Sequence, residues 1–317
     1  MSAPSPTAPG RNDLLHRPLP SSPPPPPLPL GLTPLHGPPR HEHLVLIIGV
    51  GPGMGLCIAQ HFAAQGYATA LLSRDVQRLE GWARELDVVA KERLRRDREE
   101  ANQSGSQGKA EEAAPLSRGV FCDVLDPDSV LTGIRSALQL FPGRKLGTAI
   151  YNASVRVKRP FLAQTEAQVR DSFQASIMSS FVFMKECVTL MKGGEEGVGG
   201  AGTGSGGTIL ATGATSATRG RASFAAFSMG KTGLRRICEV AAREHGKDNI
   251  HIAHIVIDGL IDSSAARKHL GLSDSEYFHD DTVVDPREAA KAYLFLAQQA
   301  PSAWTFEMDL RPAREHF

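Results

Sequence analysis

A short aliphatic run leads straight into a glycine turn in the segment Leu44-Val45-Leu46-Ile47-Ile48-Gly49-Val50-Gly51-Pro52-Gly53-Met54-Gly55. The segment Leu56–Ala64 follows directly, and its apolar residues repeat with helical spacing. Where a strand, a turn and a helix meet in this way, unpaired N–H groups and the helix dipole attract a phosphate. The stretch therefore predicts the phosphate-binding turn of a dinucleotide site.

Three glycines carry this prediction. Gly49, Gly53 and Gly55 fit the spacing GxxxGxG, whereas the spacing GxGxxG fails from either Gly49 or Gly51. Glycine is required in such a turn because a Cβ would block the turn itself and the close approach of a phosphate. We expect all three to contact the cofactor.

The end of the second predicted strand bears on which nicotinamide cofactor binds. NAD-selective proteins usually place a carboxylate here for the ribose 2′-hydroxyl, and this sequence has Ser73 followed by Arg74. A guanidinium can pair with a 2′-phosphate, so the sequence favours NADP(H) over NAD(H). The alternative is a surface arginine at the start of a helix, with Asp75 beside it.

Short aliphatic runs alternate with longer segments of helical period from Leu44 onward. This pattern is typical of an α/β fold, here a single Rossmann-like, doubly wound domain with a mainly parallel sheet. Strands are predicted at Leu44–Ile48, Ala68–Leu72, Gly119–Cys122, Thr148–Tyr151, Thr208–Ala211, Ile250–Val256 and Trp304–Asp309. Helices are predicted at Pro127–Leu140, Glu166–Met191 and Pro286–Gln299, each preceded by a capping residue: Asp126, Thr165 with Gln168, and Asp285.

The domain organisation follows from composition. Residues 1–40 are rich in proline and are predicted to be a disordered arm, and residues 41–317 form the folded domain. Two insertions are expected within that domain, a mixed-charge stretch at 84–116 that prolongs a helix into a solvated loop, and a glycine-rich linker at 193–207.

Charge and cysteine content exclude several classes of partner. A net charge of +1 over 317 residues, with no basic face readable, predicts neither nucleic acid nor an anionic membrane as partner. The longest convincing apolar run, Leu44–Val50, is far shorter than the about 20 residues that cross a bilayer. The four cysteines stand far apart, which predicts reduced thiols and no metal site. We expect a cytoplasmic protein. Organellar import stays open as an alternative, because the N-terminal arm contains Arg11 and Arg17 and a single nearby acid, Asp13.

Several short motifs follow the glycine turn along the chain. The glycine turn is followed by Cys122-Asp123-Val124, by Asn152-Ala153 and by Phe227-Ser228-Met229-Gly230-Lys231. Together they resemble the short-chain dehydrogenase/reductase family, over about His43 to Leu310. The resemblance implies a seven-stranded sheet, a small-molecule substrate and a homo-oligomer, either dimer or tetramer. It also implies that Asp123 lies at the adenine ring and that Asn152 and Ala153 lie beside the cofactor.

The resemblance breaks down at the positions that transfer a proton. Phe227 stands where the family has its tyrosine, Ala214 where it has its serine, and Ser176 where it has an asparagine. Of these four positions only Lys231 is retained, and without the tyrosine its remaining role is to hold the nicotinamide ribose. Asp258-Gly259 also replaces the family's usual Pro-Gly.

Two functions are compatible with these residues. The first is an atypical NADP(H)-dependent oxidoreductase for a small carbonyl or conjugated substrate, which takes its proton from water or from another hydroxyl. The hydroxyls weighed are Tyr151, Thr212, Thr215, Ser216, Ser228 and Tyr277, with Thr215 and Ser216 nearest the lost serine. The alternative is a catalytically silent NADP(H)-binding module that signals through a protein partner.

Overall fold

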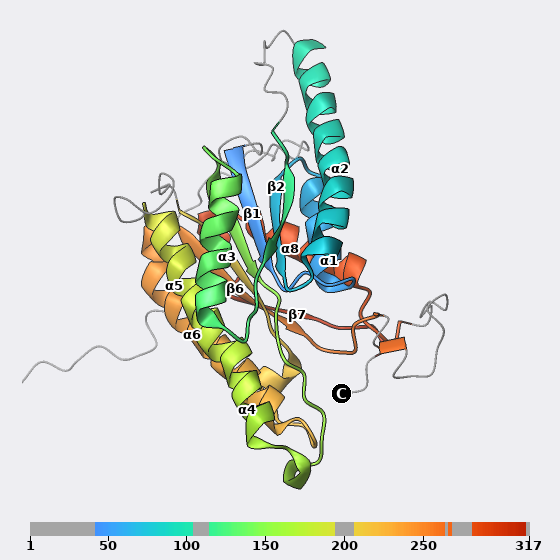
Figure 1. The fold of residues 1–317 in the computed structure, drawn as a ribbon, viewed down its shortest axis with the longest axis vertical. Coiled ribbons are helices and arrows are strands. Elements are labelled where there is room, and N and C mark those ends of the chain that lie inside the picture. Colours follow the sequence, from blue (N-terminus) through green and yellow to red (C-terminus); the bar gives the residue numbers. More distant parts are fainter. Residues whose placement is uncertain (1–41, 104–113, 194–205, 264–265, 268–280, 315–317) are drawn as a thin grey trace, which may run out of the picture. The chain divides into compact units, whose positions relative to one another are not determined.

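A seven-stranded parallel sheet forms the centre of the structure, a computed structural model that describes residues 42–103, 114–193, 206–263, 266–267 and 281–314 (Figure 1). The strands lie in the order β3-β2-β1-β4-β5-β6-β7. They are β1 (His43–Ile48), β2 (Ala68–Ser73), β3 (Ser117–Phe121), β4 (Lys145–Tyr151), β5 (Gly207–Thr212), β6 (Ile250–Ile257) and β7 (Glu307–Leu310). The predicted Rossmann-like, doubly wound fold is confirmed. The expected arm at 1–40 lies outside the described residues.

Helices cover both faces of this sheet (Figure 1). On one side lie α1 (Met54–Ala63), α2 (Val76–Gln103) and α8 (Pro286–Ala297). On the other lie α3 (Pro127–Leu140), α4 (Glu166–Phe173), α5 (Ser179–Lys192) and α6 (Ala225–His245). Because both faces are covered, every residue of β6 is buried. None of the described helices is long and apolar enough to span a bilayer.

The predicted helix caps are present. The Asp126 carboxylate accepts a hydrogen bond from the backbone N–H of Asp128, and Asp285 does the same for Arg287. Thr165 and Gln168 form a capping box at the start of α4. These local signals were sufficient because a cap depends only on residues within one helical turn.

Several predicted elements differ from the structure, and β4 already begins three residues before the predicted Thr148. The single helix expected at Glu166–Met191 is interrupted by a π-helical turn, η3 (Gln174–Met178), which separates α4 from α5. The last strand begins at Glu307 and not at Trp304, and the last helix ends at Ala297. Neighbouring strands and packing set these boundaries, which a local pattern does not record.

The mixed-charge stretch expected as an insertion begins inside a long helix. Residues 84–103 belong to α2, which is held on its surface by ion pairs one turn apart, such as Lys91 to Asp87 at 2.8 Å. The glycine-rich linker is expected up to Gly207, yet β5 already begins at that residue. The rest of both segments lies mainly outside the described part of the chain.

The strand order places a topological switch point between β1 and β4. From β1 the chain proceeds to β2 on one side, whereas β4 is followed by β5 on the other. Open α/β sheets bind ligands at such a switch point, beyond the carboxyl ends of the strands. There the backbone N–H of Asn152 donates to the carbonyl of Ile48 at 2.9 Å, so the residues that follow β1 and β4 lie together.

Candidate functional site

Two of the three motif glycines are required by backbone packing. Gly49 has a φ of +87°, and a Cβ on it would lie 2.7 Å from the backbone N of Ala153 and the carbonyl of Asn152. A Cβ on Gly55 would lie 2.7 Å from the carbonyl oxygen of Gly49. These glycines let the turn after β1 pack against the segment after β4.

Gly53 differs because no described atom crowds it. A Cβ there would come no nearer than 3.7 Å to another atom, the Cβ of Ser263, and one on Gly51 would meet nothing within 4 Å. Gly53 is also the N-cap of α1, which has no side-chain cap and no acidic residue in its first turn. As far as the described residues go, the space in front of α1 is therefore open, and the helix dipole there has no negative side chain from that first turn.

A hydrogen-bonded network joins three strand ends beside this turn. Asn152 Nδ2 donates to the carbonyl of Gly49 at 3.0 Å, and its Oδ1 accepts from Thr212 Oγ1 at 2.8 Å. Thr212 Oγ1 also lies 2.7 Å from the hydroxyl of Tyr293 on α8. Lys231 Nζ donates to the carbonyl of Thr212 at 2.6 Å. The structure thus brings Gly49, Asn152 and Lys231 together.

Tyr293 did not emerge from the sequence. It is fully buried on α8, and burial raises the pKa of its hydroxyl well above the ordinary value, so it stays neutral and serves as a structural hydrogen-bonding group. Its partner Thr212 lies 81 residues away. The Thr at the end of a strand was the one available signal, and it does not identify the partner.

Lys231 is a buried cation. Its side chain lies on α6 and is 3% exposed, and burial lowers its pKa to about 8. It uses one of its three N–H donors on Thr212, and its Nζ lies 5.9 Å from the centre of the Phe227 ring. The cation therefore sits beside the aromatic residue that replaces the family's tyrosine.

The substituted positions leave no hydroxyl on the Phe227 ring or on Ala214. Phe227 is buried and packs 6.2 Å from the ring of Phe224. Ser176 lies in η3, where its buried Oγ has no hydrogen-bond partner among the described residues. A Cβ on Gly230 would come within 2.9 Å of the Ser176 Cβ, so α6 packs directly onto this turn.

The nearest substitute hydroxyl is already engaged. Thr215 Oγ1 donates to Asp258 Oδ1, and the other carboxylate oxygen of Asp258 lies 3.2 Å from Arg311 Nη2. The backbone N–H of Asp258 donates to Leu310 at 2.9 Å, a bond that the family's usual proline lacks. The departure at Asp258 thus ties the end of β6 to both Thr215 and β7.

The other hydroxyls that the sequence suggested have different roles. Tyr151 is buried and donates to the carbonyl of Ala175, and Thr212 belongs to the network described above. Ser228 Oγ is buried without a partner among the described residues, and Ser216 lines the same cavity as Ser228. Tyr277 lies outside the described residues.

The residues expected at the adenosine end lie near the ends of β2 and β3. Asp123 Oδ1 accepts from the backbone N–H of Leu125 at 3.0 Å. Arg74 is exposed and makes no ion pair with another described residue. Asp75 is instead engaged by Arg78, whose backbone N–H it accepts at 3.1 Å and whose guanidinium lies 3.3 Å away. The neighbour that weakened the cofactor assignment of Arg74 is therefore occupied.

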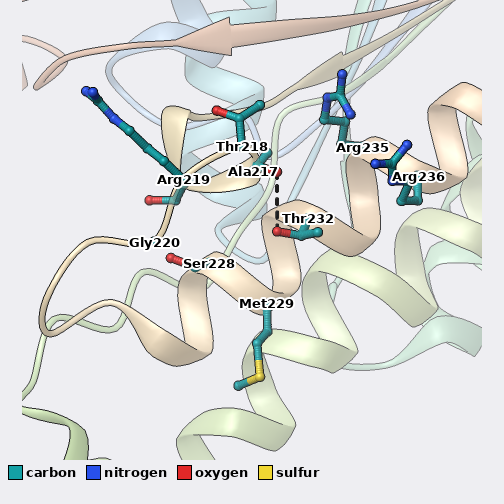
Figure 2. A pocket seen from close by; sticks show the side chains of 10 residues that line it. Ala217, Thr218, Arg219, Gly220, Ser228, Met229, Thr232, Arg235 and Arg236 are labelled. Atoms are coloured by element: carbon teal, nitrogen blue, oxygen red, sulfur yellow. Dashed lines mark hydrogen bonds between the residues drawn. The ribbon is translucent and has the colours of Figure 1, made fainter. Parts of the chain in front are cut away.

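A cavity of about 600 Å³ opens on another face of α6 (Figure 2). The described residues that line it do not include Phe227 or Lys231. Arg235 and Arg236 line it but are paired with Glu307 and Glu239, and Arg219 points away from both of them (Figure 2). This cavity is distinct from the switch point of the sheet, where the motif residues lie.

Metal ligation finds no support in the part of the chain that the structure describes. No group of three or more His, Cys, Asp or Glu side chains there is placed to hold an ion. The four cysteines are free and buried, and burial raises the pKa of Cys122 and Cys238 to about 12.

The strand order, the glycine turn and the buried lysine beside it define a Rossmann-type protein. A family model described as enoyl-(acyl carrier protein) reductase matches residues 87–308. The chain belongs to the short-chain dehydrogenase/reductase family. A comparison with curated proteins found no match.

Solved structures support the same family. A short-chain dehydrogenase from Rhodopseudomonas palustris is 28% identical, with a TM-score of 0.60 over 86% of this chain and 99% of that one. L-Sorbose reductase from Gluconobacter frateurii, complexed with NADPH and L-sorbose, is 19% identical, with a TM-score of 0.65 over 86% and 96%. An alcohol dehydrogenase from Thermococcus sibiricus, complexed with 5-hydroxy-NADP, is 19% identical, with a TM-score of 0.65 over 86% and 98%. At 19% identity the last two show the fold alone.

Proposed function

We propose that this chain is an NADP(H)-dependent oxidoreductase that acts on a small conjugated carbonyl compound and takes its proton from water. The observation that carries the proposal is the space before α1 that no described atom fills, in a turn linked through Asn152 and Thr212 to a buried lysine at the switch point of the sheet. Two structural relatives are complexed with NADPH or an NADP derivative.

The residues at the switch point fit a dinucleotide. A phosphate would take the place that a Cβ on Gly53 would fill, against the uncapped start of α1. The other proposed contacts are the turn at Gly49 and Gly55, Arg74 at the 2′-phosphate, Asp123 at the adenine ring, and Asn152, Ala153 and Lys231 along the nicotinamide ribose. When bound, the reduced cofactor supplies the hydride.

Lys231 positions the ribose in this account. One N–H of its ammonium is fixed by the Thr212 carbonyl, which sets the direction of the other two. Asn152 holds the turn after β1 through Gly49, and Thr212 holds Asn152 in place. These contacts fix the cofactor site before a ligand arrives, which lowers the entropic cost of binding.

The lost proton donor determines the substrate class. Positioned acid catalysis contributes typically about 10²–10⁴-fold, so reduction of a simple ketone beside Phe227 and Ala214 should be slow. Thr215 does not replace the donor, because its hydrogen already points to Asp258. When a conjugated enone accepts hydride, the negative charge spreads over the oxygen and carbon atoms of the resulting enolate. Water can protonate this enolate afterwards.

A substrate panel tests this proposal. Purified full-length protein is given NADPH with matched enones and saturated ketones, and loss of the reduced cofactor is followed by absorbance. We expect enones to be consumed about 100-fold faster than the corresponding ketones. Faster reduction of the saturated ketones would contradict the proposal.

The second candidate is a silent NADP(H)-binding module that signals through a protein partner. The loss of the proton donor favours it, because Phe227 and Ala214 carry no hydroxyl and the hydroxyl of Thr215 is engaged by Asp258. Tight NADPH binding with no consumption across the whole panel would support it over the enzyme.

The proposed phosphate site gives a clear difference between two neighbouring glycines. Gly53→Ala should leave the melting temperature unchanged, because its Cβ meets protein atoms only at 3.7 Å, yet weaken NADPH binding at least about tenfold. Gly55→Ala should lower the free energy of unfolding by about 1–3 kcal/mol, because its Cβ meets backbone at 2.7 Å. Thermal melts and NADPH titrations of both variants measure these effects. Equal NADPH affinity of Gly53→Ala and the natural protein would remove the phosphate from this position.

The preference for NADP(H) rests on Arg74. Arg74→Glu should weaken NADPH binding by about 10- to 100-fold, because charge-assisted hydrogen bonds to the 2′-phosphate are lost, and should leave NADH binding nearly unchanged. Arg84→Glu, an exposed charge reversal further along α2, is the matched control. Titration with both cofactors measures the difference, and equal losses for NADPH and NADH would remove this role.

The proposed homo-oligomer has a candidate contact face. A groove of about 730 Å³ between α5 and α6 is lined by Phe181, Met184, Val188, Ile237 and Val240 among others. Phe181 and Val240 are more than half exposed, which is unusual for side chains of this size. Light scattering of the purified protein measures the subunit number, and a monomer at all concentrations would contradict the proposal.

A further inference from the structure

Five cations gather on two loops at the carboxyl end of the sheet. The first loop, residues 154–164, follows β4, and the second, residues 218–224, follows β5, so both extend from the ends that carry Asn152 and Thr212. They contribute Arg156, Lys158, Arg159, Arg219 and Arg221, all exposed, and no aspartate or glutamate. We call these two segments the mouth loops.

The mouth loops are joined to each other and to α6. The backbone N–H of Arg159 donates to the carbonyl of Ser223 at 2.9 Å, and Gln164 Nε2 donates to the carbonyl of Arg159 at 2.9 Å. Gln164 Oε1 accepts from the backbone N–H of Ala226 at 2.9 Å, in the first turn of α6. Ser223 has a φ of +72°, a strained conformation that these bonds hold in place. The cations therefore project from a fixed platform.

Arg156 connects this platform to the reaction site. Its guanidinium carbon lies 5.2 Å from the centre of the Phe224 ring, and that ring packs 6.2 Å from Phe227. An arginine stacked on an aromatic face keeps its in-plane N–H donors available for a second partner. Arg156 is thus placed one aromatic ring away from the position of the lost tyrosine.

The charges at the mouth are not neutralised within the described protein. Among the described residues, Arg156, Lys158, Arg159 and Arg221 make no ion pair with a carboxylate. Arg219 lies 3.9 Å from Asp258, but that carboxylate is closer to Arg311 and also accepts from Thr215. Like charges brought together on joined loops repel each other, and an anionic ligand would relieve this repulsion.

We propose that the mouth loops select an anionic substrate, in which a carboxylate or phosphate lies away from the carbon that accepts the hydride. Arg156 binds that group, and the other cations of the mouth loops raise the local concentration of the anion. The inference rests on the proposed cofactor site and adds to it the class of substrate.

The test compares a carboxylate with its methyl ester, which lacks the negative charge and carries one extra methyl group. Full-length protein saturated with NADP⁺ is titrated calorimetrically with 4-(3-oxobut-1-enyl)benzoate and with its methyl ester. We expect the acid to bind about tenfold more tightly than the ester at low salt, and this advantage to shrink as salt is added. Because the readout is binding, it does not depend on turnover.

Variants assign the effect to the mouth. Arg156→Gln should remove most of the difference between acid and ester, and adding Arg219→Gln should remove the rest. Arg84→Gln, on α2, should leave the difference intact, and melting temperature and NADP⁺ affinity should be unchanged in all three variants. Loss of NADP⁺ affinity in Arg156→Gln would assign these cations to the cofactor and overturn the inference.

The two proposals fail in different ways. Equal affinity for acid and ester, or no binding of the acid, overturns the anionic substrate while NADP⁺ binding keeps the cofactor site. Absence of NADP⁺ binding to the natural protein overturns both.

Discussion

Replacing Phe227 with tyrosine and Ala214 with serine should raise the reduction of saturated ketones by NADPH about 10²–10⁴-fold over the natural protein. The reason is that the lysine of the proton-transfer site is already in place. Lys231 Nζ lies 5.9 Å from the ring that would carry the new hydroxyl, and the nearby cation would favour the ionised form of a tyrosine. Ala214 precedes Thr215 at the end of β5, where a serine would support the bound carbonyl.

Single variants and a distant phenylalanine serve as controls for this gain. Phe227→Tyr alone should produce a smaller increase than the pair, because the carbonyl still lacks the serine. Phe295→Tyr, on the exposed side of α8, should produce none. If the double variant binds NADPH normally and still fails to reduce ketones, the geometry around Lys231 does not support the family's chemistry.

Lys231→Met should weaken cofactor binding substantially. Hydrogen bonds to charged groups contribute about 1.5–3 kcal/mol, so we expect NADPH to bind about 10- to 100-fold more weakly. The fold should survive, because methionine fills a similar volume and removes a cation from a buried site. Lys185→Met, an exposed change on α5, is the control. Unchanged affinity would show that the lysine does not contact the cofactor.

The same lysine predicts a pH dependence. Its pKa is lowered from 10.5 to about 8, so the ammonium loses its proton as pH rises through 8. NADPH affinity should fall over that range in the natural protein and stay flat in Lys231→Met. Stability should move in the opposite direction. Between pH 8 and 10.5 the unfolded chain still holds the proton that the folded chain has lost, so the free energy of unfolding rises there relative to Lys231→Met.

Local patterns were enough to predict most of the fold. α3 begins at Pro127 and ends at Leu140 as expected, because Asp126 caps it and its apolar residues face the core. Strand positions also followed from short aliphatic runs, since a parallel sheet covered on both faces buries nearly every residue. The π-helical turn η3 escaped prediction because its composition does not differ from that of the helices around it.

The site was only partly predictable for a different reason. Glycine spacing and Lys231 are visible along the chain, but the bonds that position them join distant residues. Thr212 meets Tyr293 across 81 residues, and Thr215 meets Asp258 across 43. The mouth loops become a single charged surface because Arg159 bonds to Ser223 and Gln164 bonds to Ala226, contacts between distant residues that the near-neutral overall charge does not reveal.

Direct titration of the purified full-length chain with NADPH, NADP⁺ and NADH tests the central claim, that the turn after β1 binds a nicotinamide dinucleotide. We expect one cofactor molecule per chain, with NADPH bound more tightly than NADH and with binding weakened in Gly53→Ala. The claim would be contradicted if none of the three cofactors bound to protein that circular dichroism shows to be folded.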